Sequence, residues 1–290
     1  MNLPFQIDLK NKVIVITGGG GVICGTFARA VAACGAKTAI LDLRKENADK
    51  VAAEITAQGG TAMGVAANVL DIESLKAAKK TVNEAYGTCD ILINGAGGNH
   101  PKGTTTMEYY TPGDEAKADL ISFFDLDPEG ISFVFNLNFL GTLLPTQVFA
   151  PDLIGKKDAA IINISSMNAF TPLTKIPAYS GAKAAVSNFT QWLAVHFSKV
   201  GIRVNAIAPG FFVTDQNRAL LFDENGKPTA RTEKILSQTP MDRFGEVEEL
   251  VGTLLWLFFP AGFFFLKGTS SFVNGTVIPV DGGFSAYSGG

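Results

Sequence analysis

Apolar runs and amphipathic stretches alternate along the chain and predict its secondary structure. Short β-branched runs bounded by glycine or polar residues are typical of buried strands, whereas apolar positions spaced every three or four residues are typical of helices. Strands are predicted at residues 12–17, 37–41, 61–67, 91–93, 160–165, 203–208 and 276–280. Helices are predicted at residues 27–34, 48–58, 72–86, 133–149, 178–199 and 247–258.

The order of these elements predicts the fold. Strand and helix alternate with no linker between the halves, which favours a parallel sheet with helices on both faces. We therefore predict an α/β fold: a single Rossmann-like, doubly wound domain over residues 1–290, with about seven strands. Two polar segments interrupt the alternation, at residues 99–130 and 211–245. Both follow strands whose carboxyl ends form the ligand-binding edge of such sheets, so we expect two substrate-side insertions, the second a lid.

Composition and charge narrow the class of protein. A chain of 290 residues, 47% of them hydrophobic, can bury a stable core without disulfides. Three cysteines make a poor disulfide framework and two histidines offer no zinc-ligand spacing, so we expect no metal. The net charge of −3, without a basic cluster, argues against a nucleic-acid partner. The first residues lack the apolar stretch of a signal peptide, which favours a soluble, cytoplasmic protein.

Residues 254–266 are unusually rich in phenylalanine, with the sequence LLWLFFPAGFFFL. These 13 residues are fewer than the roughly 20 that cross a bilayer, and Pro260 and Gly262 interrupt them. We interpret the segment as buried or as a contact between subunits, and we expect no membrane partner. A membrane-surface patch is the alternative.

A run of glycines between the first strand and the first helix indicates a nucleotide site. Residues 18–21 are all glycine, which lets the backbone approach a pyrophosphate, and the N-terminus of the helix offers unpaired N–H groups. Gly25 follows, where close packing between helix and strand would exclude a side chain. Asp42, at the end of the second strand, can accept both ribose hydroxyls of NAD and would repel the 2′-phosphate of NADP. We therefore predict NAD over NADP. The alternatives are a plain tight turn for the glycines, and a helix N-cap or a solvated turn for Asp42.

Tyr179 and Lys183 are four residues apart in a predicted helix, so they share one face. A neighbouring ammonium favours the phenolate and would lower the pKa of the tyrosine, which would allow proton transfer with an alcohol oxygen near neutral pH. Ser166, at the end of a strand, can hydrogen-bond the same oxygen. Asn138 can hold a water that joins Lys183 to solvent. A Tyr–Lys pair at this spacing is common by chance, so the prediction depends on the whole set.

Taken in order, these motifs resemble the short-chain dehydrogenase/reductase family over essentially the whole chain. The matching positions are Thr17–Gly21, Asp42, Asn94–Gly97, Asn138, Ser166, Tyr179, Lys183, Pro209 and Gly210 with Thr214, and Val280–Gly283. The resemblance implies a catalytic tetrad of Asn138, Ser166, Tyr179 and Lys183, and commonly a homotetramer. It also implies NAD(P) across the carboxyl edge of the sheet, held by Gly18, Gly20, Gly21, Val22, Ile23, Asp42, Asn68, Val69, Asn94, Ala96, Gly97, Tyr179, Lys183, Pro209, Gly210, Phe212, Val213 and Thr214.

Two departures from the family pattern affect the cofactor site. The family usually has glycines where this chain has Val22 and Cys24, which puts the pyrophosphate contacts in question. The family's adenine-contacting aspartate is Asn68 here, whose amide oxygen can still accept a hydrogen bond from an amino group.

The loops, and not the fold, select the substrate in this family. The expected substrate residues are Asn99, His100, Lys102, Met167, Asn168, Gln216, Asn217 and Arg218. Their hydrogen-bond donors and positive charges suit a polyhydroxylated acid better than an apolar steroid or acyl chain. Residues 95–100, 123–141, 165–177 and 211–221 also resemble the D-mannonate oxidoreductase subgroup, which implies NAD(H)-dependent interconversion of D-mannonate and D-fructuronate.

Three alternatives stay open. The first is another sugar-acid or polyol dehydrogenase, such as a gluconate 5-dehydrogenase. The second is a non-catalytic NAD-binding redox sensor, which would have no reason to keep both Tyr179 and Lys183. The third is a membrane-associated reductase that uses the phenylalanine-rich segment.

Overall fold

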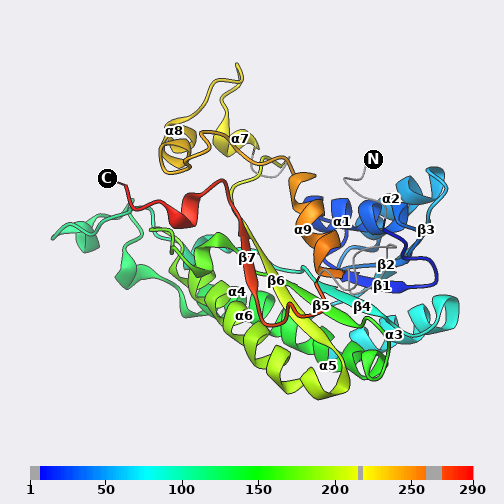
Figure 1. Cartoon of the computed structure of the whole chain (residues 1–290). Helices are drawn as coiled ribbons and strands as arrows, with labels where there is room; N and C mark the ends of the chain where they lie inside the picture. The colour runs from blue at the N-terminus through cyan, green and yellow to red at the C-terminus, as the bar shows by residue number, and fades with distance from the viewer. Residues whose placement is uncertain (1–6, 215–217, 259–269, 290) are drawn as a thin grey trace.

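Seven parallel strands form one sheet at the centre of the molecule (Figure 1). The computed structural model describes residues 7–214, 218–258 and 270–289. The strands are β1 (Val13–Thr17), β2 (Lys37–Asp42), β3 (Thr61–Ala66), β4 (Ile91–Asn94), β5 (Ala160–Ile164), β6 (Arg203–Pro209) and β7 (Val277–Val280). Their spatial order is β3-β2-β1-β4-β5-β6-β7, so the direction of winding reverses between β1 and β4. Open α/β sheets bind ligands at such a reversal, beyond the carboxyl ends of the strands.

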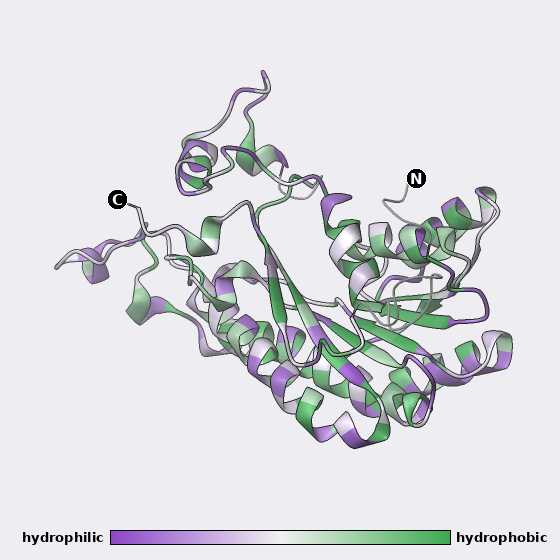
Figure 2. Ribbon diagram, in the orientation of Figure 1, coloured by the Kyte–Doolittle hydropathy of each residue, from purple (hydrophilic) through white to green (hydrophobic). Residues whose placement is uncertain are grey.

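Helices cover both faces of this sheet. They are α1 (Val22–Ala33), α2 (Lys45–Ala57), α3 (Ile72–Tyr86), α4 (Pro128–Phe135), α5 (Gly141–Leu153), α6 (Pro177–His196) and α9 (Glu249–Phe258). Side chains alternate along each strand, so Ile14 and Ile16 of β1 pack with α1, α2 and α9, whereas Val13 and Val15 pack with α3, α5 and α6. Figure 2 shows the resulting hydrophobic strands between amphipathic helices. The predicted doubly wound, seven-stranded α/β fold is confirmed.

The helix predicted at residues 133–149 is longer in the structure. It runs from Pro128 to Leu153, with a π-helical segment at Asn136–Leu140 between α4 and α5. Asp127 caps its start by accepting the Glu129 N–H at 2.8 Å, and proline is well tolerated at the first helical position. Length and a mean hydropathy of 1.3 would allow this helix to cross a membrane. Its inner residues, such as Phe149 and Leu153, are fully buried in the layer against the sheet, as in a core helix.

Both predicted insertions follow the carboxyl ends of strands. The first contains three short 3₁₀ helices, Pro101–Gly103, Asp114–Ala116 and Phe123–Asp125; the second contains α7 (Arg218–Leu221) and α8 (Ala230–Ser237), which the hydrophobic pattern did not predict. Figure 1 shows the second insertion rising beyond β6, with the first extending to one side. An ion pair between Lys234 of α8 and Glu108 joins the two insertions.

Part of the phenylalanine-rich segment belongs to α9. Leu254, Leu255, Leu257 and Phe258 are buried there, as the first interpretation expected. Residues 259–266 lie outside the described residues. The partly buried guanidinium of Arg203 donates to the carbonyl of Leu257 at 2.9 Å and so holds the end of α9 against β6.

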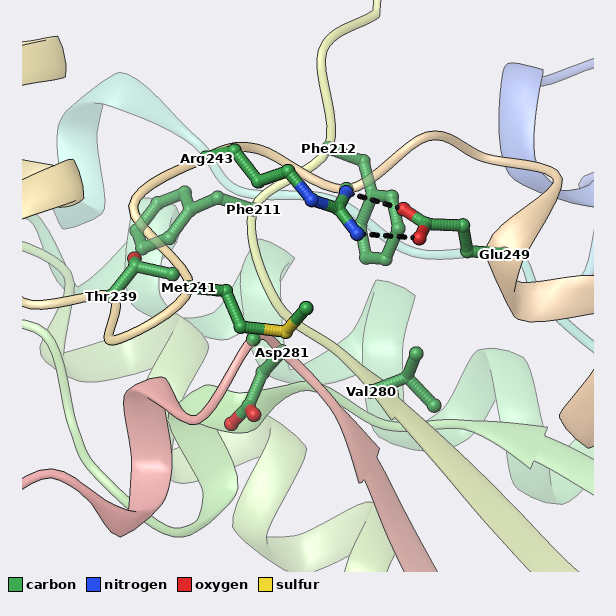
Figure 3. A pocket seen from close by; sticks show the side chains of 10 residues that line it. Phe211, Phe212, Thr239, Met241, Arg243, Glu249, Val280 and Asp281 are labelled. Atoms are coloured by element: carbon green, nitrogen blue, oxygen red, sulfur yellow. Dashed lines mark hydrogen bonds and ion pairs between the residues drawn. The ribbon is translucent and has the colours of Figure 1, made fainter.

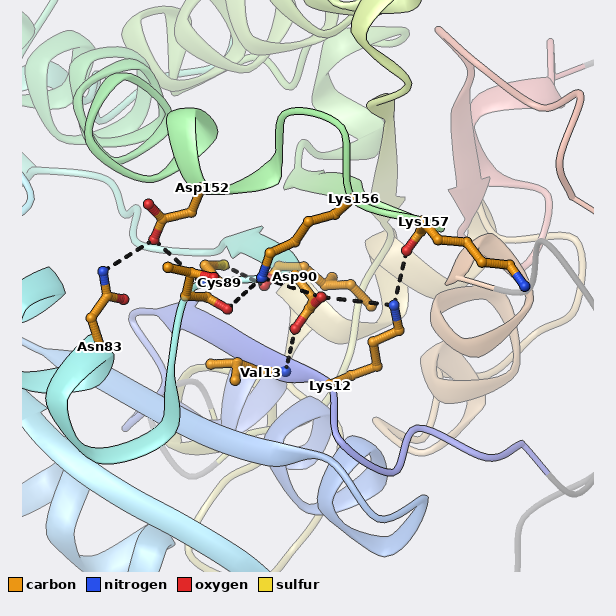
Figure 4. A network of polar contacts seen from close by, with 10 residues as sticks. Lys12, Val13, Asn83, Cys89, Asp90, Asp152, Lys156 and Lys157 are labelled. Atoms are coloured by element: carbon orange, nitrogen blue, oxygen red, sulfur yellow. Dashed lines mark hydrogen bonds and ion pairs between the residues drawn. The ribbon is translucent and has the colours of Figure 1, made fainter.

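Ion pairs close the opposite, amino-terminal edge of the sheet (Figure 4). Asp90, just before β4, accepts the Val13 N–H at 2.9 Å. Its other oxygen lies 3.7 Å from the Lys12 ammonium and 3.3 Å from that of Lys156. The carboxylate therefore ties β1 and the approach to β5 to the start of β4, far from the ligand-binding edge.

Candidate active site

The glycine turn brings three chain segments together at the carboxyl edge. Gly18 has a φ of +63°, and a Cβ on it would lie 2.9 Å from the Cα of Ala96. A Cβ on Gly20 would lie 2.9 Å from Oδ2 of Asp42. Gly21 caps α1 without any side-chain hydrogen bond, so the first N–H groups of the helix stay available. A helix N-terminus approached only by glycine backbone suits a pyrophosphate.

Asp42 lies at the end of β2, beside this turn. Its Oδ2 accepts the Gly20 N–H at 3.1 Å and its Oδ1 accepts the Arg44 N–H at 3.0 Å. A carboxylate oxygen can accept more than one hydrogen bond. Both oxygens are therefore held in place and keep acceptor capacity for two ribose hydroxyls, as NAD requires.

The residues that follow the glycine turn, at positions 22–25, differ from the family pattern, and the structure shows how they pack. The expectation for Gly25 was wrong, because a Cβ there would meet its neighbours only at the ordinary contact distances of 3.4 Å and beyond. The tight packing is at Gly95, where a Cβ would lie 2.1 Å from the sulfur of Cys24. The cysteine thus occupies the space that Gly95 leaves free, and the turn keeps its close approach to the strand ends.

Three more of the predicted cofactor residues differ in where their side chains or backbone point. The Asn94 amide points into the core and donates to Thr146 Oγ1 and Asn163 Oδ1, both at 2.9 Å. The Oδ1 of Asn68 accepts the Leu70 N–H at 3.0 Å and keeps one lone pair. A Cβ on Gly210 would lie 2.5 Å from the Cα of Asp281, so the Pro209–Gly210 turn is packed against the end of β7.

Tyr179 and Lys183 share one face of α6, as predicted. The ammonium of Lys183 donates to the carbonyl of Ile164 at 2.8 Å and lies 5.7 Å from the centre of the Tyr179 ring. Ser166 lies two residues after the end of β5, and its side chain lowers the pKa of Tyr179. The sheet edge and the start of α6 therefore bring a hydroxyl, a phenol and an amine together.

The acid–base balance of this cluster differs from the prediction. Burial lowers the pKa of Lys183 to about 8. Burial also raises the pKa of Tyr179, although the hydrogen bond from Ser166 acts in the opposite direction. The expected lowering of the tyrosine pKa by the ammonium is therefore wrong for the protein alone, because desolvation of the phenolate is the largest effect on this group.

Asn138 lies in the π-helical segment and faces the loop after β4. Its Nδ2 donates to the carbonyls of Gly98 and Val134, both at 2.7 Å, and its Oδ1 accepts the Gly98 N–H at 3.2 Å. Its own carbonyl accepts the Thr142 hydroxyl at 2.9 Å. The side chain thus positions the Gly97–Gly98 loop beside Lys183, and the water-binding role stays a prediction.

Most predicted substrate residues of the first insertion are engaged within it. Lys102 forms an ion pair with Asp127 at 2.9 Å. His100 accepts the Lys102 N–H at 3.2 Å through Nδ1, and its ring lies 5.0 Å from that of Phe133. The Asn99 amide donates to Thr104 Oγ1 at 3.0 Å. These contacts shape the insertion and neutralise the charge of Lys102.

The other predicted substrate residues fall into two groups. Met167 and Asn168 follow Ser166 and are buried. Gln216 and Asn217 lie outside the described residues. Arg218 begins α7 and is exposed, and within the described part of the chain it forms no ion pair.

The sequence reasoning missed the contribution of the C-terminal segment. A short helix at Phe284–Ala286 contacts the Met167–Ala169 turn, and the Phe284 ring lies 5.4 Å from that of Phe211. A cavity opens beside it (Figure 3), lined by Phe211, Phe212, Thr239, Met241, Arg243, Gly245, Glu249, Val280, Asp281 and Gly282. The signal was the Val280–Gly283 motif, which the resemblance matched but to which no role was given.

Arg243 is the positively charged residue of this cavity, and Glu249 neutralises its charge. Its two terminal nitrogens donate to the two carboxylate oxygens of Glu249 at 2.8 and 2.7 Å. The guanidinium holds the pKa of Glu249 down to about 2. The pair therefore stays ionised at neutral pH and braces the second insertion against α9. Ser166, Tyr179 and Lys183 are not among the residues that line this cavity.

Comparison with known proteins points to the same family as the sequence motifs. The family model for short chain dehydrogenases matches residues 12–225. A Haemophilus influenzae protein named "Uncharacterized oxidoreductase" is 61% identical over 289 residues, which cover 100% of this chain and 98% of that protein.

Two solved structures are informative. One is a Haemophilus influenzae protein provisionally named a D-mannonate oxidoreductase, with bound NAD; it is 61% identical, with a TM-score of 0.90 over 97% of this chain and 98% of that one. The other is a gluconate 5-dehydrogenase from Burkholderia cenocepacia in complex with NADP and tartrate. It is 29% identical, with a TM-score of 0.77 over 97% of this chain and 98% of that one.

Proposed function

Because the chain belongs to the short-chain dehydrogenase family, we propose that it interconverts D-mannonate and D-fructuronate with NAD(H). The observation that carries this proposal is the whole-length likeness to the NAD-bound Haemophilus protein provisionally named for that substrate. The cluster of Ser166, Tyr179 and Lys183 supports the hydride-transfer chemistry, and Asp42 supports NAD over NADP.

The cofactor, when bound, accepts or supplies the hydride at the carbon that bears the reacting oxygen. In reduction, Tyr179 gives its proton to that oxygen, and in oxidation it removes the proton from the alcohol. Ser166 donates a hydrogen bond to the same oxygen and orients it. Lys183, with a pKa of about 8, carries its charge near neutral pH and stabilises the phenolate that forms when Tyr179 has lost its proton.

Arg218 is our candidate for binding the substrate carboxylate. The other cations named for this side of the molecule are paired: Lys102 with Asp127, Lys234 with Glu108 and Arg243 with Glu249. Arg218 has no such partner in the part of the chain that the structure describes, and a guanidinium binds a carboxylate through two parallel hydrogen bonds. We also propose a cytoplasmic homotetramer, in keeping with the resemblance.

The test is to follow NADH absorbance with D-fructuronate, 5-ketogluconate and other keto acids, and to repeat each assay with NADPH. Rapid oxidation of NADH by fructuronate alone supports the proposal. Faster turnover of 5-ketogluconate would move the substrate to the gluconate 5-dehydrogenase type. Tight NADH binding without turnover of any keto acid would favour the redox sensor, and flotation with liposomes would favour the membrane-associated reductase.

A further inference from the structure

Asn168 was expected to contact substrate, but its side chain is turned into the protein. It lies two residues after Ser166 and is only 6% exposed. Its Nδ2 donates to the hydroxyl oxygen of Ser166 at 3.1 Å. Its Oδ1 accepts the Leu173 N–H at 3.2 Å and the Ser180 hydroxyl at 3.4 Å. One amide thus joins the catalytic serine to the following loop and to the first turn of α6.

The orientation of this amide is set by its neighbours. A backbone N–H can only donate, so the atom that faces Leu173 must be the oxygen. The amide nitrogen therefore faces Ser166, and it can only donate. The direction of the hydrogen bond between Asn168 and Ser166 follows from these two facts.

Ser166 receives a second hydrogen bond from the same residue. The backbone N–H of Asn168 donates to the Ser166 Oγ at 3.2 Å. A serine hydroxyl has two lone pairs and one hydrogen. With both lone pairs occupied by N–H groups, its single hydrogen is left to be donated to another partner, which is Tyr179 in the free protein or the reacting oxygen when substrate is bound.

We propose that Asn168 is a positioning residue that makes the Ser166 hydroxyl an obligatory hydrogen-bond donor to the reacting oxygen. This inference takes the identity of the substrate from the proposed function, whereas the contacts of Asn168 come from the structure alone. A carbonyl oxygen gains negative charge as hydride reaches its carbon, so a fixed donor stabilises the transition state more than the ground state. The side chain of Ser166 lowers the pKa of Tyr179, which is the effect that a donor has on a phenolate.

The Asn168→Asp variant isolates the donor half of the amide. A carboxylate can still accept from Leu173 and Ser180, but it cannot donate to Ser166 and instead accepts the serine hydrogen. We expect kcat to fall by about a hundredfold, the lower end of the loss that follows removal of one oxyanion donor, with NADH binding unchanged. The pH profile of alcohol oxidation should also move to higher pH, because Tyr179 loses a donor to its phenolate. Asn11→Asp, which adds the same charge in an exposed turn at the amino-terminal edge of the sheet, is the matched control and should retain full activity.

The decisive measurement repeats the substitution in a Ser166→Ala background. If Asn168 acts through the serine hydroxyl, Asn168→Asp should lower kcat by no more than about twofold there, because contacting residues are non-additive. An equal loss in both backgrounds would overturn the proposal and assign Asn168 a purely structural role. Thermal unfolding and NADH titration identify any variant that fails to fold. In that case Asn168→Ala is carried through the same cycle, with the same two outcomes.

Failure of the proposed substrate can be told apart from failure of this inference. If the wild type does not reduce fructuronate, the cycle is run with whichever keto acid it reduces. If it reduces none, carbon NMR of protein labelled at tyrosine Cζ reports the hydrogen bond at Tyr179 without turnover. The Tyr179 resonance should move in Asn168→Asp and should not move further when the substitution is added to Ser166→Ala; a shift of equal size in both backgrounds would refute the inference.

Discussion

Lys183 should reduce the stability of the protein at neutral pH while it serves the reaction. It is almost fully buried, and burial lowers its pKa from 10.5 to about 8. At about 1.36 kcal/mol for each pKa unit, this corresponds to a penalty of roughly 3 kcal/mol for keeping the charged form in the folded state. The variant Lys183→Met removes that penalty but leaves the carbonyl of Ile164 without its donor, which costs about 1–2 kcal/mol. We therefore expect the variant to be about 1–2 kcal/mol more stable at neutral pH and to lose most of its turnover.

The lowered pKa of Lys183 also sets how the stability difference between the two proteins changes with pH. Between a pH of about 8 and 10.5, folded Lys183 binds fewer protons than the unfolded chain does, so wild-type stability should gain from this group as the pH rises. The advantage of Lys183→Met is therefore greatest below about pH 8 and shrinks as the pH approaches 10.5. Urea unfolding of both proteins across this range measures it. Lys80→Met, at a lysine side chain that is 77% exposed, is the control and should show no such trend. A Lys183→Met variant that is less stable than wild type at every pH would refute the reasoning.

Four further outcomes are expected. Tyr179→Phe should lower turnover by about a hundredfold or more without weakening NADH binding; near-normal kcat would remove the tyrosine from its role. Arg218→Met should raise the KM for the keto acid about tenfold or more with little change in kcat, which steady-state kinetics can separate. Asp42→Ser should shift the NADH-to-NADPH preference by about tenfold or more toward NADPH, since the repelling carboxylate is gone; an unchanged ratio would contradict the assignment. Asp90→Asn should lower the free energy of unfolding by about 1–3 kcal/mol, because two lysines lose their partner, while kcat stays at the wild-type value.

The strands and most helices were predictable because their signals are local. Helix α3 coincides with the prediction at residues 72–86, since Asp71 caps its start and Gly87 ends it. Helix α1 begins at Val22, five residues before the predicted start. The glycine turn leads directly into this helix, and its first turn lacks the alanine-rich pattern that marked the rest. Helices α7 and α8 were missed because they are short, four and eight residues long.

The sequence by itself determined the sheet, the glycine turn, the position of Asp42 and the shared face of Tyr179 and Lys183. Each of these follows from spacing along the chain, which sets strand alternation, helix periodicity and the order of motifs. Only the tertiary structure decided which hydrogen bonds the polar side chains of the site form and how their pKa values are shifted. The amide of Asn168 could not be assigned from the sequence because its partners, Leu173 and Ser180, are brought to it by a turn. Likewise, Lys183 is desolvated by the elements that fold around it, and burial depends on the whole fold rather than on neighbours in the chain.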